Sequence, residues 1–160
     1  MPELPEVETM CRGIQPVVGS RIRQVKRPKS TLQPMTIFPQ VARLRKRLVG
    51  KTIVGVSRLG KKVVVELDNR DRMVFEPRMT GLVLLVDPPD ENHLRLIVEL
   101  SDRRTRRLLF WSQRGLSVLR LLSPRQFLEH YGPQRLGPDA LDISVELLQQ
   151  RFRNSARAIK

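Results

Sequence analysis

Short segments in which apolar and polar residues alternate dominate the middle of the chain. Such alternation places successive side chains on opposite faces of a β-strand. Turn-type residues, such as Gly60 and the run Asp87-Pro88-Pro89-Asp90, separate the segments. The pattern therefore predicts a mainly β protein, an antiparallel β-sandwich or barrel with flanking helices. The predicted strands are Arg21–Lys26, Lys51–Leu59, Lys61–Leu67, Arg72–Phe75, Leu82–Val86, Leu94–Leu100, Thr105–Trp111 and Leu116–Leu121.

Helical spacing of apolar residues appears before and after these strands. Pro5 suits the first turn of a predicted N-terminal helix. Residues 28–39 carry three prolines and predict a loop, and a short helix is predicted at Gln40–Leu48. Ser123 and Ser144 are candidate N-caps of two further helices. The apolar residues of the N-terminal helix are Val7, Met10, Cys11, Ile14 and Val18.

Composition indicates the class of partner. The chain has 160 residues, enough for one domain or for one domain and a fragment of a second. It contains 30 Lys and Arg against 16 Asp and Glu, so the net charge is +14 and the isoelectric point is near 11.4. A surface of this charge attracts polyanions, among which nucleic acid is the usual partner.

Other partners and compartments fit the sequence less well. No apolar run reaches the roughly 18 residues of a membrane span, and no basic amphipathic helix or lipidation motif favours a membrane surface. Cys11 is the single cysteine, so the chain offers neither an internal disulfide nor a cysteine-type zinc site. The acidic N-terminus has no signal-peptide pattern. We therefore expect a cytoplasmic protein with no metal or cofactor in this chain.

The first eight residues, Met1-Pro2-Glu3-Leu4-Pro5-Glu6-Val7-Glu8, carry the most specific candidate chemistry. Cells usually trim methionine before a small residue, which would leave Pro2 as a free secondary amine. An α-amino group has a pKa of about 7.7–8, so part of it is neutral near pH 7 and can attack a sugar C1′ carbon to form a Schiff base. Glu3 follows closely enough to move protons. If Met1 stays, however, Pro2 is an amide nitrogen and cannot attack.

The octet resembles the start of the formamidopyrimidine-DNA glycosylase and endonuclease VIII family, and Leu4 and Glu8 favour the formamidopyrimidine branch. The resemblance implies base excision repair: removal of oxidised purines from double-stranded DNA, followed by cutting of the abasic strand. It implies Pro2 as the nucleophile, Glu3 as the general acid and base, and Glu6 as a residue that shapes the substrate-facing start of the helix. The alternative is an ordinary helix opening with Pro and acids in its first turn.

Lys61 and Met79 match two further motifs of the family. The resemblance implies that Lys61, in the pair Gly60-Lys61, reaches the DNA backbone beside the terminal amine. A lysine that only protects a sheet edge is the alternative. Met79, in Met79-Thr80-Gly81, resembles the family methionine that enters the duplex where the damaged base has been taken out of the stack. A methionine buried in the core is the alternative there.

Arg114 and Leu116 resemble the family's Asp-x-Arg-x-Phe segment, with two departures. The resemblance implies that Arg114 faces the orphaned base and that Leu116 takes the place of the aromatic wedge. Ser112 stands where the family has the acid, and Glu76 stands where it has a histidine before the methionine turn. These departures affect the expected lesion and opposite-base preferences and leave the terminal-amine chemistry unchanged.

The end of the chain defines the predicted domain organisation. We expect residues 1–135 to form the catalytic β-sandwich domain. Residues 136–160 are expected to be a linker and the first helical segment of a truncated helix–two-turn–helix module. The resemblance implies that Lys160 lies near the phosphate backbone, and that structural zinc belongs to a C-terminal part missing from this chain. We expect a monomer.

Two alternatives to the enzyme remain open from the residues alone. One is a non-catalytic basic nucleic-acid-binding domain of the same ancestry, with weak and salt-sensitive binding. The other is a generic basic β-barrel of a ribosomal or RNA-processing protein, which explains the charge and the strands but leaves the first eight residues unexplained.

Overall fold

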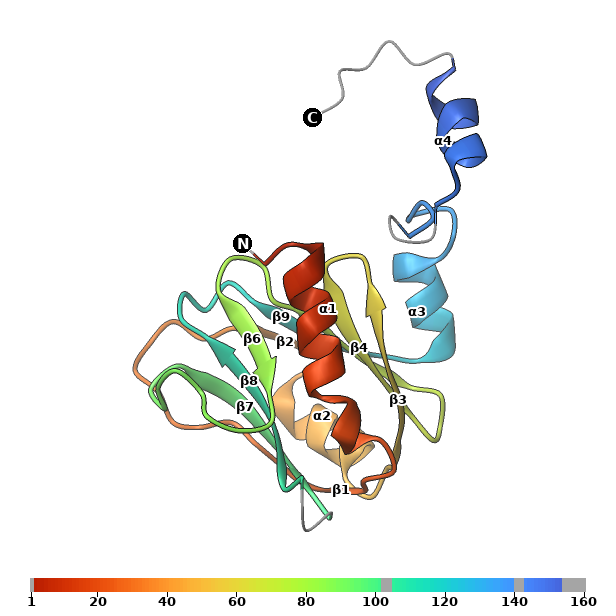
Figure 1. Ribbon diagram of the computed structural model, residues 1–160. Helices are drawn as coiled ribbons and strands as arrows, with labels where there is room; N and C mark the ends of the chain where they lie inside the picture. The colour runs from red at the N-terminus through yellow and green to blue at the C-terminus, as the bar shows by residue number, and fades with distance from the viewer. Residues whose placement is uncertain (1, 102–104, 140–142, 154–160) are drawn as a thin grey trace.

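A computed structural model describes residues 2–101, 105–139 and 143–153, and two β-sheets make up most of it (Figure 1). Four strands form one sheet in the order β1-β7-β8-β6. They are β1 (Ile22–Lys26), β7 (Leu94–Leu100), β8 (Arg107–Ser112) and β6 (Gly81–Leu84). Five strands form the other sheet in the order β2-β9-β5-β4-β3. They are β2 (Thr36–Phe38), β9 (Val118–Leu122), β5 (Arg72–Glu76), β4 (Lys62–Leu67) and β3 (Ile53–Leu59).

The sheets form a sandwich whose strands are nearly all antiparallel. Within the described ranges, β2 and β9 are the one parallel pair. An isolated bridge between Arg21 and Thr52 joins the edges of the two sheets, and no closed barrel forms among the described strands. The predicted sandwich is therefore confirmed, whereas the barrel alternative is wrong.

Side chains from both sheets fill the space between them, and the five-stranded sheet is also covered on its outer face. Val63 and Val65 of β4 belong to the main core, while Val64 between them packs with Val74 and Leu122 in a second cluster. Phe127, on helix α3 (Pro124–Tyr131), packs against that second cluster. The run of three buried valines thus has a simple cause, because alternate residues pack on opposite faces that are both covered.

Helix α1 (Leu4–Gly13) bridges the two sheets. It contacts β3 and β4 of the five-stranded sheet and β6 of the other, and it lies across the front of both sheets in Figure 1. Its buried residues Val7, Met10 and Cys11 recur at helical spacing, as the sequence predicts. The helix ends at Gly13, a 3₁₀ turn η1 (Gln15–Val17) follows, and Val18 is exposed. Pro16 explains this earlier end because it has no N–H for a continuing helix.

Helix α2 (Val41–Leu48) packs against β1 and β2, with Leu44 and Leu48 buried. Strand β2 lies inside the segment 28–39 that the prolines predict as loop, and this prediction is wrong for three residues. The strand is short and its register comes from distant β9, with Thr36 opposite Val118. Local sequence carries little information on such a pairing.

The C-terminal part consists of helices. Ser123 caps α3 by accepting a hydrogen bond from the Gln126 N–H, and Ser144 caps α4 (Val145–Phe152) by accepting one from Leu147. Both caps agree with the sequence prediction. Helix α4 buries none of its residues and lies beyond α3, away from the sheets (Figure 1). The proposed boundary between residues 135 and 136 stays a prediction. None of the described helices is long and apolar enough to cross a membrane.

Candidate active site

The N-terminal motif lies at the start of α1 and is held there by local hydrogen bonds. Glu3 is the N-cap residue, and its backbone N–H donates to the carboxylate of Glu6. This is one arm of a capping box, in which the third helical residue reaches back to the cap. Glu6 therefore fixes the direction in which the chain enters the helix, while its expected role toward a substrate stays a prediction. Pro2 is half-buried immediately before the cap.

Lys61 comes from a different element and meets this motif. Gly60 has φ of +55°, a left-handed conformation that glycine adopts at little cost, and it makes the tight turn between β3 and β4. The turn directs Lys61 toward the helix start, where its Nζ forms an ion pair with the Glu3 carboxylate. The side chains of Lys61 and Glu3 are 46% and 58% exposed, so both remain accessible to a ligand. Three residues singled out from the sequence, Pro2, Glu3 and Lys61, are thereby gathered at one place.

Arg58, on β3, is a residue at this site that the sequence analysis does not single out. Its side chain is 8% exposed and its guanidinium holds three separate segments. Nε donates to Glu8 on α1 at 3.1 Å, Nη1 donates to the carbonyl of Gly60 at 3.2 Å, and Nη2 donates to Asp139 at 2.7 Å. A single side chain thus connects the helix of Pro2, the turn of Lys61 and the segment after α3.

The hydrogen-bond partners of Glu8 and Arg58 shift the pKa values of both side chains. Hydrogen bonds from Arg12 and Arg58 lower the pKa of Glu8 below its ordinary value. The hydrogen bond to Asp139 is the largest cause that raises the pKa of Arg58, against an opposing effect of burial. Glu8 therefore stays ionised near neutral pH and is not suited to be a general acid.

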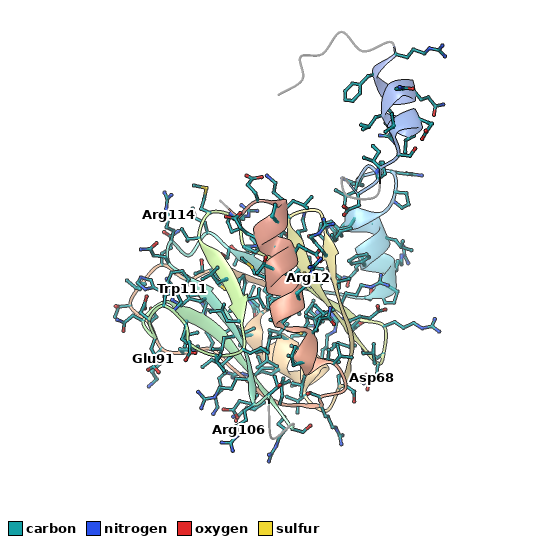
Figure 2. All side chains as sticks on the ribbon, in the orientation of Figure 1. Arg12, Asp68, Glu91, Arg106, Trp111 and Arg114 are labelled. Carbon is teal, nitrogen blue, oxygen red and sulfur yellow. The ribbon has the colours of Figure 1, made fainter. Side chains whose placement is uncertain are left out.

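Two neighbouring turns carry the residues expected to enter DNA. Met79 is 42% exposed and Leu116 is 40% exposed, so neither is a core residue. The backbone N–H of Arg114 donates to Thr80 Oγ1 at 3.2 Å, and the Ser117 hydroxyl donates to the carbonyl of Pro77 at 2.8 Å. The turn that carries Met79, between β5 and β6, and the turn that carries Arg114, between β8 and β9, are therefore held together. Figure 2 shows Arg114 on the same side of the molecule as the start of α1, and Arg106 on the opposite side.

Arg95 holds the turn that carries Arg114, and it is a second residue that the sequence analysis does not identify. It is 4% exposed, and it donates from Nε to the Ser112 carbonyl at 2.8 Å and from Nη2 to the Gln113 carbonyl at 3.2 Å. Burial lowers the pKa of Arg95. These bonds fix the two carbonyls that precede Arg114.

The two departures from the family pattern have defined structural surroundings. Ser112 is fully buried, and its hydroxyl donates to Ser117 Oγ at 2.8 Å, since the one Ser117 proton is given to the Pro77 carbonyl. Glu76 accepts hydrogen bonds from Arg120 at 3.1 Å and from the Tyr131 hydroxyl at 2.8 Å. Glu76 thus attaches α3 to the sheet, and Ser112 hydrogen-bonds to the serine that joins the two turns.

The described residues offer no site for zinc. They contain no group of three or more His, Cys, Asp or Glu side chains that could hold a metal ion. Cys11 is buried, its Sγ donates to the Ser57 carbonyl at 3.4 Å, and burial raises the pKa of its thiol to about 11. A protonated and buried thiol is a poor zinc ligand. Lys160, expected near the DNA backbone, lies outside the described residues.

Solved structures of DNA-bound enzymes share this fold. Lactococcus lactis formamidopyrimidine-DNA glycosylase, non-covalently bound to DNA that contains an abasic site, superposes with a TM-score of 0.79 at 30% identity. The match covers 99% of this chain and 60% of that one. A complex of the wild-type Lactococcus lactis enzyme with DNA containing N7-benzyl-Fapy-dG matches with a TM-score of 0.76, again at 30% identity, over 96% of this chain and 56% of that one. The described fold is therefore the one found in these DNA-bound glycosylases.

Sequence relatives specify the family. The family model described as the formamidopyrimidine-DNA glycosylase N-terminal domain matches residues 1–119, and the chain belongs to that family. Formamidopyrimidine-DNA glycosylase of Lactococcus lactis subsp. cremoris is 31% identical over the whole chain, and that of Rhizorhabdus wittichii is 35% identical over 87% of it. The chain spans 58% and 52% of these two relatives, respectively.

Proposed function

We propose that this protein is a DNA glycosylase with abasic-site lyase activity, in which the Pro2 nitrogen is the nucleophile. The ion pair between Glu3 and Lys61 is the observation that carries the proposal. It joins a candidate proton donor and a candidate phosphate-binding cation beside the residue whose nitrogen can attack. An ordinary helix opening gives no reason for a lysine from another turn to meet the N-cap.

The first chemical step would be displacement of the damaged base. The Pro2 nitrogen attacks C1′ of the deoxyribose as the glycosidic bond breaks, and the base leaves with the bonding electrons. Glu3 delivers a proton during base departure and opening of the sugar ring. The Pro2 nitrogen loses its proton and the C1′–O4′ bond breaks, with the protonated O4′ as the leaving hydroxyl, so the product is an open-chain iminium that joins the nitrogen of Pro2 to C1′.

The second step would cut the strand. Loss of a proton from C2′ of the iminium sends an electron pair toward C3′, and the phosphate on C3′ leaves as the anion. Lys61 neutralises and orients the strand beside the lesion. Water then releases the sugar fragment and regenerates the free amine of Pro2.

The remaining residues would bind the duplex. Met79 fills the space that the extruded base leaves, Arg114 faces the orphaned partner base, and Leu116 wedges the stack. Relatives bound to DNA with an abasic site or a modified Fapy-dG support double-stranded DNA with such lesions as the substrate. Oxidised purines are the proposed lesions to be excised.

Three further points belong to the same proposal. The protein would act as a monomer, and Lys160 would contact a phosphate. The buried free thiol and the DNA substrate favour the cytoplasm as its compartment. Structural zinc would be held by residues other than those described.

Borohydride trapping tests the proposal directly. The protein is incubated with duplex DNA that holds an abasic site or 8-oxoguanine, and borohydride reduces any iminium to a stable covalent adduct. Mass spectrometry of the intact protein first verifies that Met1 is absent. We expect an adduct with the native protein. Loss of the adduct is expected when one extra residue precedes Pro2, because an amide nitrogen cannot attack.

Matched variants give this experiment its controls. Pro5→Ala changes the same motif without altering the terminal amine and should retain the adduct. Glu3→Gln should lower the rate of base excision by about 10²–10⁴-fold, the usual contribution of a general acid or base. No adduct from a protein with a verified free Pro2 would contradict catalysis and would favour the non-catalytic DNA-binding domain.

A further inference from the structure

Arg58 makes contacts that exceed what a stabilising ion pair needs. A buried ion pair is often no better for stability than apolar residues of similar volume. Arg58 nevertheless divides its donors among three segments that are distant in sequence: Glu8 on α1, the Gly60 carbonyl and Asp139. A planar guanidinium can hold three acceptors in fixed directions, whereas a lysine is a single flexible point charge.

Two of the three acceptors lie close in sequence to the residues that need relative alignment. Glu8 lies on the same short helix as Glu3, the N-cap residue next to Pro2. Gly60 is the residue immediately before Lys61, and its carbonyl accepts a hydrogen bond from Arg58 Nη1 at 3.2 Å. The position of Lys61 relative to Pro2 therefore depends on how β3 and its turn are held against α1.

The other ion pairs near this junction are more exposed than those of Arg58. Both side chains of the Glu3–Lys61 ion pair are exposed, and exposed pairs contribute little to stability. Arg12 also binds Glu8, at 2.9 Å, but its side chain is 79% exposed and both residues belong to α1. Among these contacts, the bonds of Arg58 are the buried ones that connect the helix to the turn.

We propose that Arg58 is a positioning residue that aligns Pro2 and Glu3 with Lys61 and ties this alignment to the segment containing Asp139. The alignment of reacting groups rests on the proposed function, whereas the mechanical link between the segments does not. The bond to Asp139, at 2.7 Å, is the shortest of the three. The segment that follows α3 therefore contributes to the geometry of the N-terminal site although it is far from it in sequence.

The test uses Arg58→Lys in the full-length protein, with two matched controls. Arg12→Gln removes the exposed partner of Glu8 and keeps the link between helix and turn. Arg47→Lys alters a different half-buried arginine, whose Nη2 lies 2.6 Å from Asp71 and which holds neither α1 nor the Lys61 turn. This variant therefore measures the effect of replacing a guanidinium by an amine elsewhere in the fold.

The first readout is the single-turnover rate of adduct formation with abasic-site DNA, compared with the DNA dissociation constant. Misplacement of reacting groups by about 1 Å can cost 10²-fold in rate. We expect Arg58→Lys to lower the rate by about 10–100-fold, with a much smaller change in DNA affinity. Arg12→Gln and Arg47→Lys should stay near the native rate. An equal rate loss for Arg47→Lys would overturn the positioning role.

The second readout is amide hydrogen exchange, which does not depend on catalysis. Arg58→Lys should increase exchange together in residues 4–8, 59–62 and 136–139, while Arg12→Gln should leave residues 59–62 unchanged. Unchanged exchange in Arg58→Lys would overturn the link even if the native protein is active. Coordinated release in a protein that never forms an adduct would support the link and reject only the proposed catalysis.

Discussion

At the scale of single residues, Tyr131 shows how a buried polar group fixes an element to the sheet. Its hydroxyl donates to Glu76 at 2.8 Å, and Arg120 donates to the same carboxylate oxygen at 3.1 Å. Three elements, β5, β9 and α3, therefore meet at Glu76. Burial first, and then the hydrogen bond to Glu76, raise the pKa of Tyr131 to about 12.

Titration of Tyr131 should reveal this environment directly, because it is the single tyrosine of the chain. The phenolate absorbance should rise with a midpoint near pH 12, against the ordinary value of 10.0. The folded state holds the proton more tightly than the unfolded state. The stability from this group is therefore complete below pH 10 and is lost as the pH rises toward 12.

The matched variant for this titration is Glu76→Gln. It keeps a hydrogen-bond acceptor for the Tyr131 hydroxyl and removes the negative charge that disfavours the phenolate. The midpoint should therefore move down toward the ordinary value. A native protein that is still folded by circular dichroism and titrates at 10 would contradict the assigned environment.

Sequence motifs identify some of the candidate site residues and miss others. Pro2, Glu3 and Lys61 occur in recognisable motifs, and the structure brings Glu3 and Lys61 into contact. Arg58 and Arg95 are two among 30 basic residues, and no motif distinguishes them. Strand alternation would expose Arg95 between Leu94 and Leu96, but a register shift at this point in the pairing of β7 with β8 accompanies the burial of all three side chains.

At the scale of elements, the turn between β5 and β6 is a tightly built part of the candidate DNA-binding surface. A Cβ atom at Gly81 would lie 2.5 Å from both the Pro77 carbonyl oxygen and the Ser117 hydroxyl oxygen. The Gly81 N–H also donates to the Pro77 carbonyl at 2.9 Å. The exposed position of Met79 thus depends on a glycine two residues later.

Gly81→Ala should lower the free energy of unfolding by about 1–3 kcal/mol, the usual cost of forcing extra atoms into a packed site. Gly13→Ala is the matched control, since a Cβ atom there meets nothing within 4 Å. At a compatible position this change should stabilise by roughly 0.4–1 kcal/mol. Urea unfolding measures both variants. Equal stability of the two alanine variants would show that the turn tolerates a side chain.

Elements with a strong local pattern could be predicted, and those fixed by distant partners could not. Helix α1 has buried residues at regular helical spacing, and strand β4 is a run of valines. By contrast, β2 is a strand because Thr36, Ile37 and Phe38 lie opposite residues of β9 about eighty positions later. A closed barrel and a sandwich share the same strand alternation, so only the sheet edges separate them.

At the scale of the whole molecule, the net charge of +14 should dominate DNA affinity. Binding to a duplex without a lesion should weaken linearly on a plot of log affinity against log salt, with a slope of about −0.9 for each phosphate neutralised. Lys61→Gln should reduce the magnitude of this slope by about 1. Fluorescence anisotropy at several salt concentrations gives the slope.

Arg106→Gln provides the comparison, because Arg106 lies on the side of the molecule opposite Arg114 (Figure 2). It removes the same charge as Lys61→Gln and should leave the slope unchanged if the duplex binds at the side of α1. Equal reductions for both variants would indicate that the duplex has no preferred face.

Helix α1 belongs to neither sheet alone, since it packs on β3 and β4 from one side and on β6 from the other. The surface on which α1 packs is complete only when both sheets have formed. Under the proposed function, a chain that stalls partway through folding would not present an aligned amine to deoxyribose. Immature copies would then leave the genome untouched, and strand cleavage would require the fully folded molecule.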